Sequence, residues 1–249
     1  SSETLRLSDA PLRLIMLTPF ETEALLLSLK VGGIATLGAL IPAILISYLL
    51  ARGRFPLKWL LDGIVHAPLV VPPVVIGYLL LIGLGPRGPI GAPLKDWFGI
   101  TIAFTWQGAA VAAGVMAFPL MVRAIRLSLE QVDMRLEQAA TTLGAGRWDV
   151  FFSITLPMIA PGIVVSIILG FARALGEFGA TITFVANIPG ETRTMPLALY
   201  TLAQTPGAEA QAGRLALLSV VVALIALIAS EVIARKTRRA IGLHGERAA

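Results

Sequence analysis

The chain has 249 residues, of which 56% are hydrophobic and only 14% are charged. Because soluble domains carry about 25% charged residues, this composition excludes a disordered chain, a coiled coil and an ordinary soluble domain, and it indicates a protein embedded in a membrane. The sequence has no cysteine and two histidines, which excludes disulfides and thiolate sites and argues against a histidine-based metal site. The net charge of +5 is spread along the chain, which favours a role in membrane topology over nucleic-acid binding.

Five segments are long and apolar enough to cross a bilayer. A spanning helix needs about 20 mostly apolar residues, and only isolated charges interrupt these segments. We therefore predict an all-α membrane protein of five transmembrane helices. Its transmembrane domain covers 24–240, with spans at about 31–50, 64–84, 102–122, 158–186 and 215–234.

The basic residues are distributed unequally between the two sides of these spans. Most of the 20 Lys and Arg residues fall in the connections after spans one and three and after span five. Because cytoplasmic loops carry an excess of Lys and Arg, we predict a multi-pass protein with an external N-terminus and a cytoplasmic C-terminus. Residues 1–23 then form an external segment, and residues 241–249 form a cytoplasmic tail.

Prolines interrupt two of the predicted spans. Pro72 and Pro73 are adjacent in the second span, and Pro119 lies near the inner end of the third. Proline removes a helical hydrogen bond and bends or breaks a helix, so we predict helix bends at these three residues. The simpler interpretation of the bends is that they shape the bundle.

Two opposite charges lie deep within the fourth span. Arg173 and Glu177 are four residues apart, so they share one helix face and can neutralise each other. A charge inside a bilayer is costly and marks either a structural pair or a transport path. In the second interpretation Arg173 lines the path of an anion and Glu177 limits how tightly the anion is held. The candidate residues of such a path or gate are Arg173, Gly176, Glu177, Phe178, Gly179 and Thr181.

The predicted cytoplasmic connection between spans three and four, residues 130–157, has an amphipathic pattern. Leu136, Ala140 and Leu143 recur at helical spacing beside polar residues, which predicts a short surface helix. Gly144 and Gly146 follow and favour a turn. From these residues alone, an interfacial helix lying on lipid headgroups and a docking helix for a partner are equal alternatives.

The same connection resembles the coupling motif of ABC-importer permeases. That motif reads Glu-Ala-Ala, three residues, Gly, nine residues, Ile, one residue and Leu-Pro. Here, at the same spacing, the chain has Gln138, Ala139, Ala140, Gly144, Ile154, Leu156 and Pro157. Gln138 replaces the first glutamate, although Glu137 precedes it. The resemblance implies a type I importer permease fold with a cytoplasmic coupling helix that docks on an ATPase. Its contact or hinge positions are Glu137, Gln138, Ala139, Ala140, Leu143, Gly144, Arg147, Leu156 and Pro157.

The chain lacks a phosphate-binding loop of the form GxxxxGK[ST], so we predict a non-catalytic subunit whose partner hydrolyses ATP. The resemblance implies a homodimer of permeases, two ATP-binding-cassette ATPases that bind ATP and Mg, and a periplasmic or extracellular solute-binding protein. It also implies that this multi-pass protein lies in the bacterial cytoplasmic (inner) membrane. No cofactor is expected in this chain.

Over nearly the whole chain the sequence resembles the molybdate permeases of the ModB family. The similarity is carried by stretches at 69–77, 118–126, 171–181 and 187–193. It implies a permease for molybdate, and tungstate is not separable because both are tetrahedral dianions. Sulfate and thiosulfate permeases look similar in these stretches but usually carry an additional N-terminal span, so they are the alternative. An ATP-independent secondary anion transporter or channel is the alternative of a different class.

Overall fold

The computed structural model describes residues 17–240, and within this range every regular element is a helix. The predicted tail 241–249 and most of the predicted external segment 1–23 lie outside the described residues. The elements are α3 (Pro19–Arg52), α4 (Lys58–Val70), α5 (Pro73–Leu84), α6 (Gly91–Phe98), α7 (Trp106–Gln131), α8 (Met134–Thr142), α9 (Arg147–Val150), a π-helical turn (Phe151–Thr155), α10 (Leu156–Leu175), α11 (Gly179–Val185), α12 (Met195–Ala203) and α13 (Glu209–Ala240).

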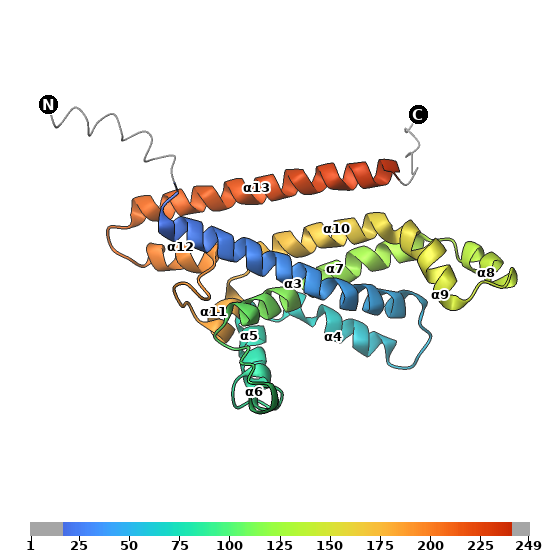
Figure 1. Cartoon of the computed structure of the whole chain (residues 1–249), viewed down its shortest axis with the longest axis horizontal. Coiled ribbons are helices and arrows are strands. Elements are labelled where there is room, and N and C mark those ends of the chain that lie inside the picture. The colour runs from blue at the N-terminus through green and yellow to red at the C-terminus, as the bar shows by residue number, and fades with distance from the viewer. Residues whose placement is uncertain (1–16, 241–249) are drawn as a thin grey trace.

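Four of the described helical segments are long and apolar enough to cross a membrane, and the bent pair α4–α5 makes a fifth if it is counted as one span. The four are α3, α7, the continuous stretch Arg147–Leu175 that ends in α10, and the part of α13 over Glu209–Ala229. They run along the long axis of the molecule (Figure 1). The all-α membrane fold is therefore confirmed, while the second and fourth spans need correction.

α3 begins earlier than the predicted first span because its start is capped. The Thr18 hydroxyl accepts a hydrogen bond from the backbone N–H of Glu21, and the Glu21 carboxylate accepts one from the N–H of Thr18 at 2.7 Å. This reciprocal capping box, with Pro19 at the first helical position, fixes the start of the helix. Residues 19–23, predicted as external, therefore belong to α3.

The boundaries of the third and fifth spans also move. α7 begins only at Trp106, because the Thr105 hydroxyl caps it by accepting the N–H of Gly108 at 3.2 Å. It continues to Gln131, beyond the predicted end at 122, so the connection predicted over 130–157 is shorter. α13 contains the predicted fifth span and extends it at both ends.

The second span, predicted over 64–84 with bends at Pro72 and Pro73, consists of two separate helices. α4 and α5 are bent by 117° relative to each other, across a break at Val71 and Pro72. Pro72 and Pro73 both lack the N–H that would continue the helical hydrogen bonds, so α4 stops and α5 starts anew with Pro73 in its first turn. As a result, α5 and α6 project sideways from the bundle (Figure 1); we call this projection, residues 73–98, the arm.

The fourth span is not the single helix predicted over 158–186 either. α10 begins at Leu156 and ends at Leu175, and after a turn over 176–178 the chain continues as α11. The Glu177 carboxylate accepts the backbone N–H of Ala180 at 2.8 Å, which satisfies one of the donors that a new helix start leaves free. A long apolar run thus contains a helix end that its hydropathy does not reveal.

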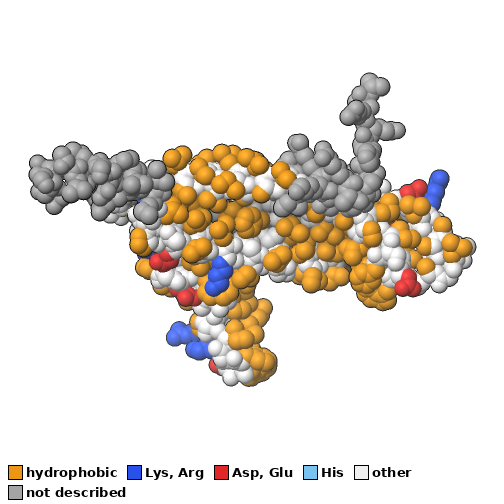
Figure 2. Space-filling view, turned by 45° about the horizontal axis from the view of Figure 1, so that its top comes forward, with side chains coloured by type: hydrophobic (Ala, Val, Ile, Leu, Met, Phe, Trp, Pro, Cys, Tyr) orange, Lys and Arg blue, Asp and Glu red, His pale blue; other side chains and the backbone are white. Residues whose placement is uncertain are grey.

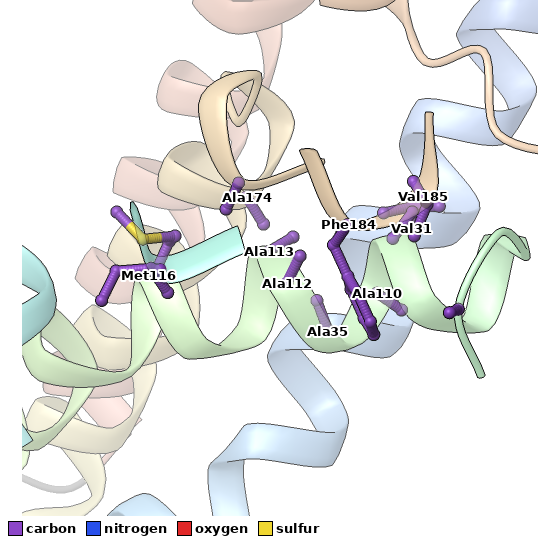
Figure 3. Close-up of a cluster of buried hydrophobic side chains, with 13 residues drawn as sticks. Val31, Ala35, Ala110, Ala112, Ala113, Met116, Ala174, Phe184 and Val185 are labelled. Carbon is purple, nitrogen blue, oxygen red and sulfur yellow. The ribbon is translucent and has the colours of Figure 1, made fainter. Parts of the chain in front are cut away.

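α7 is the centre of the bundle. Its apolar stretch is 67% buried, against 28% for α3 and 6% for α13. Most of its buried residues toward α11 are alanines, which cluster with Val31 of α3, Ala174 of α10 and Phe184 of α11 (Figure 3). Small side chains let helices approach closely inside a membrane. The outward faces carry exposed hydrophobic side chains, which suit contact with lipid (Figure 2).

α12 and the start of α13 pack on the capped end of α3. The Arg214 Nε donates a hydrogen bond to Glu21 Oε1 at 2.7 Å, and the Glu21 side chain is only 5% exposed. A small buried apolar cluster surrounds this ion pair and consists of Ala24, Met195, Ala198 and Leu215. The ion pair and the cluster hold α13 to α3 at the end of the molecule opposite α8 (Figure 1).

Candidate coupling surface and translocation path

The segment with the motif spacing forms α8, beyond the ends of the long helices (Figure 1). Asp133 caps its start by accepting the N–H of Arg135 at 2.9 Å. Gly144 follows its end with a φ of +92°, a left-handed conformation that glycine adopts without strain. This conformation allows the Ala145 N–H to donate to the Ala140 carbonyl at 3.0 Å. Gly144 therefore sets the direction in which the chain leaves α8.

Apolar side chains of α8 and of the following turns form an exposed surface. No residue of α8 is buried, and Leu143 and Trp148 are 89% and 74% exposed. Large exposed apolar groups mark a contact with a partner or an interface, and here they lie on α8 and at the very start of the apolar stretch Arg147–Leu175. We call this the α8 surface, and it consists of Met134, Leu136, Leu143, Trp148 and Phe152.

The other motif residues lie on or beside the α8 surface. Gln138 and Ala139 are exposed, Ala140 is half-buried, and Arg147 is exposed at the start of α9. The Leu-Pro end of the motif, Leu156 and Pro157, lies where the π-helical turn becomes α10. The motif therefore places its small residues outward and its last two residues at the beginning of a long helix.

Glu137 extends its side chain from α8 to the bundle. Its Oε1 accepts hydrogen bonds from Arg52 Nη2 at 3.2 Å and from Thr155 Oγ1 at 2.9 Å. The same Arg52 nitrogen donates to the carbonyl of Val132, just after α7, at 3.3 Å. The sequence pattern puts Glu137 beside the motif but does not indicate these contacts, because Arg52 lies 85 residues away along the chain.

The charge pair of the fourth span forms across the end of α10. Arg173 Nη1 lies 2.6 Å from Glu177 Oε2, and the two side chains are 27% and 1% exposed, respectively. The second Glu177 oxygen accepts the Ala180 N–H. A buried carboxylate with one cation and one backbone donor is neutralised and hydrogen-bonded, which favours the structural interpretation for Glu177. Arg173 is therefore the only one of the two whose side chain is partly exposed.

Two further candidates of the path hold the turn after α10. The Phe178 ring packs on the Tyr200 ring of α12 with the centroids 5.1 Å apart. The Thr181 hydroxyl donates to the carbonyl of Phe178 at 2.9 Å, so it bonds the local backbone, as threonine hydroxyls in helices often do. Gly176 directly follows the last residue of α10 and caps its end.

Two helix breaks meet inside the bundle. The α4–α5 break lies against the α10–α11 turn: a Cβ added to Gly179 would stand 2.7 Å from the Cβ of Pro73. One turn further along α5, a Cβ added to Gly77 would stand 2.4 Å from the carbonyl oxygen of Ala180. Interrupted helices are typical of membrane transport sites, because their freed backbone groups are tolerated where they face protein or a cavity. The sequence predicts bends at the prolines but not this contact.

Pro119 is placed differently from the other two prolines. It is buried in α7, which continues without a helix break from Trp106 to Gln131. Farther along α7, Arg126 donates to Asp62 of α4 at 3.0 Å and to Glu130 at 2.8 Å. His66 Nδ1 lies 3.2 Å from the same Asp62 oxygen. This polar cluster ties α4 to α7.

Known proteins resemble this chain in sequence and in fold. Residues 43–239 match the family model described as "Binding-protein-dependent transport system inner membrane component". The chain is 61% identical over 228 residues to the molybdenum transport system permease protein ModB of Escherichia coli (strain K12), a match that covers 92% of this chain and 100% of that protein. For the protein of the same name from Haemophilus influenzae the identity is 54% over 222 residues, with coverage of 89% and 97%. A solved bacterial ABC transporter involved in the import of the acidic polysaccharide alginate shares the fold, with a TM-score of 0.71 at 18% identity over 88% of this chain and 80% of that one.

Proposed function

The chain belongs to the ModB family of binding-protein-dependent transport permeases, and we propose that it is the membrane subunit of an ATP-driven importer for molybdate. Two copies form the translocation path, two ATP-binding-cassette ATPases bind ATP and Mg, and an external binding protein delivers the oxyanion. The observation that carries the proposal is the similarity to the E. coli and H. influenzae permeases over nearly the full length of each protein. Tungstate, a tetrahedral dianion of similar size, is expected to use the same path.

The α8 surface is the proposed contact with the ATPase. It lies beyond the ends of the long helices, and its exposed Leu143 and Trp148 offer large apolar anchors to a cleft. The exposed Ala139 beside them allows the backbone of a partner to approach closely. Because the excess of basic residues predicts that this end is cytoplasmic, the ATPases meet the permease there.

The permease performs no covalent chemistry in this proposal. ATP binding closes the ATPases, their movement displaces α8, and the bundle opens alternately to the two sides of the membrane. The place where the two helix breaks meet is the proposed gate, because α5 and α11, the helices that restart after the two breaks, contact each other directly there. Arg173 is partly exposed and lies in the last turn of α10. It is the proposed group that attracts the dianion. Its pairing with Glu177 keeps the attraction weak enough for release.

Uptake into proteoliposomes tests this function. The complex of permease, ATPase and binding protein is reconstituted, and uptake of labelled molybdate is compared between the native ATPase and a hydrolysis-deficient ATPase. We expect uptake that requires ATP hydrolysis and persists in the presence of equimolar sulfate.

The two alternatives give different results in the same experiment. Uptake that continues with the hydrolysis-deficient ATPase would identify an ATP-independent transporter or channel. Uptake of labelled sulfate in preference to molybdate, with molybdate uptake abolished by equimolar sulfate, would identify a sulfate or thiosulfate importer.

A further inference from the structure

One carboxylate beside the α8 surface joins the ends of three long helices. Arg52 lies in the last turn of α3, Val132 follows α7, and Thr155 is the last residue of the π-helical turn that leads into α10. Arg52 binds both the Val132 carbonyl and Glu137, and Glu137 in turn accepts the Thr155 hydroxyl. We call Arg52, Glu137 and Thr155 the α8 node.

The α8 node is largely shielded from water. The side chains of Arg52 and Glu137 are 14% and 16% exposed, and Thr155 is 1% exposed. Hydrogen bonds to charged groups are stronger than neutral ones, and a buried charge that loses its partner is costly. The bonds of the node therefore favour one position of α8 relative to the three long helices.

Glu137 is also the polar link between α8 and the rest of the molecule. The other side-chain hydrogen bonds of α8, as far as the described residues show, are local: the Thr141 and Thr142 hydroxyls donate to carbonyls one turn back, and Asp133 caps the helix start. None of the residues of α8 is buried, so apolar packing adds little to the attachment. A force applied to α8 reaches the bundle through its chain connections and through Glu137.

We propose that Glu137 is a positioning residue that transmits the movement of α8 to the long helices, and that it does not serve as a contact with the ATPase. The inference rests on the proposed function. Gln138, at the motif's first position, is exposed and available to a partner, whereas the neighbouring carboxylate is directed to the bundle. Through Arg52 and Thr155 the displacement of α8 reaches α3, α7 and α10 together.

The test uses the complete complex in proteoliposomes and two measurements. The first is the number of molybdate ions taken up per ATP hydrolysed. The second is the ATP-driven change in distance between spin labels on Gln204→Cys in the two permease copies. The native chain has no cysteine, so the label is unique in each copy. Gln204 is exposed, and it follows α12 at the end of the molecule opposite α8 (Figure 1).

Three single variants, one double variant and one control distinguish loss of the node from a general defect. Glu137→Ala should lower the uptake per ATP by about fivefold or more, a size typical of coupling between sites, and remove most of the distance change while ATP hydrolysis continues. Glu137→Gln keeps an acceptor for Thr155 and should give intermediate values. Arg52→Ala should resemble Glu137→Ala, and combining the two should add little further loss, because both break one link. The control Glu130→Gln removes a carboxylate whose partner, Arg126, lies on the same helix, and it should match the wild type.

Native values for Glu137→Ala in both measurements would overturn the proposal, and so would additive losses from Arg52→Ala and Glu137→Ala. If Glu137→Ala does not assemble, Glu137→Gln decides, and native values for that variant count against the node. The distance change does not depend on which solute is carried. A wild-type complex that takes up no molybdate would therefore refute the proposed function, while the label distances of the Glu137 variants would still decide the role of the node.

Discussion

Single residues decide where the helices of this permease end. Gly144 ends α8 through its left-handed backbone, and Glu177 supports the start of α11 by accepting the Ala180 N–H. Both residues act first on the backbone. Substitutions at these positions should therefore change conformation before they change contact with a solute or a partner.

Replacing Gly144 with valine should uncouple ATP turnover from transport without unfolding the permease. A β-branched residue held at a positive φ is strained by about 1–3 kcal/mol, and the chain can relieve that strain by changing direction after α8. The readouts are molybdate uptake per ATP and the Tm of the purified permease. Gly213→Ala is the matched control, because its added Cβ meets nothing within 4 Å. Equal uptake per ATP in both variants would contradict a role for the left-handed turn.

Replacing Glu177 with alanine should lower the Tm of the permease more than replacing the whole charge pair. Glu177→Ala leaves Arg173 unpaired and removes the acceptor of the Ala180 N–H, and each unsatisfied buried group costs about 1–3 kcal/mol. The double variant Arg173→Met with Glu177→Gln removes both charges and keeps an acceptor. A lower Tm for the double variant would contradict the structural role of Glu177. Uptake of molybdate by the double variant should fall, because the proposed anion-attracting group is lost. Full uptake would mean that Arg173 serves only in packing.

At the scale of helices, some close contacts form only because one partner is a glycine without a side chain. The contact between α5 and α11 passes through Gly77, where even a methyl group would overlap the backbone of Ala180. This contact keeps the base of the arm against the α10–α11 turn. A change at one glycine should therefore disturb the proposed gate.

Gly77→Ala should destabilise the permease and reduce uptake. The added Cβ would lie 2.4 Å from the Ala180 oxygen, so the helices must separate, and overpacking of this kind costs about 1–3 kcal/mol. Gly83→Ala is the control on the same helix, since its added Cβ meets nothing within 4 Å. The comparison is made by thermal unfolding in detergent and by uptake, and indistinguishable Tm values for the two variants would contradict the close contact.

Hydropathy predicts the spans α3, α7 and α13 well and the other two poorly, for a physical reason. A hydropathy window measures how much apolar chain is present but not its direction, so it treats α4 and α5 as one span despite their 117° bend. It also passes over the break between α10 and α11, where Glu177 supports the new helix start by bonding the backbone three residues later. The location of α8 follows from the sequence because the spacing of the motif is local. The α8 node does not follow, because it joins residues far apart in the chain.

At the scale of the whole molecule, large aromatic side chains are exposed in several separate regions, including α4 with Trp59. Trp148 belongs to the α8 surface and Trp97 to the arm, and α8 and α6 lie well apart (Figure 1). The two tryptophans are 74% and 78% exposed, respectively. Exposure alone therefore does not distinguish a site for the ATPase from a surface that meets lipid or another permease.

Trp148→Ala should weaken binding of the ATPase by about tenfold or more, because a buried tryptophan anchor contributes about 2 kcal/mol or more to an interface. The Tm of the permease alone should not change, since the side chain is exposed in the free subunit. Trp97→Ala provides the control for loss of an equally exposed tryptophan. Affinity is measured between purified ATPase and permease in lipid nanodiscs. Equal losses in both variants would contradict the assignment of the α8 surface.

The alanine-rich half of α7 has a mechanical consequence for the helices that pack on it. Long side chains that interdigitate must change rotamers before two helices can slide past each other. Around Ala112 and Ala113 the side chains of α7 are instead short (Figure 3). Small shear displacements of packed helices are a known route of conformational change. We therefore expect neighbouring helices to slide along this half of α7 with its side chains keeping their rotamers. In the other half, where Met121, Ile125 and Leu129 are buried, a displacement requires repacking.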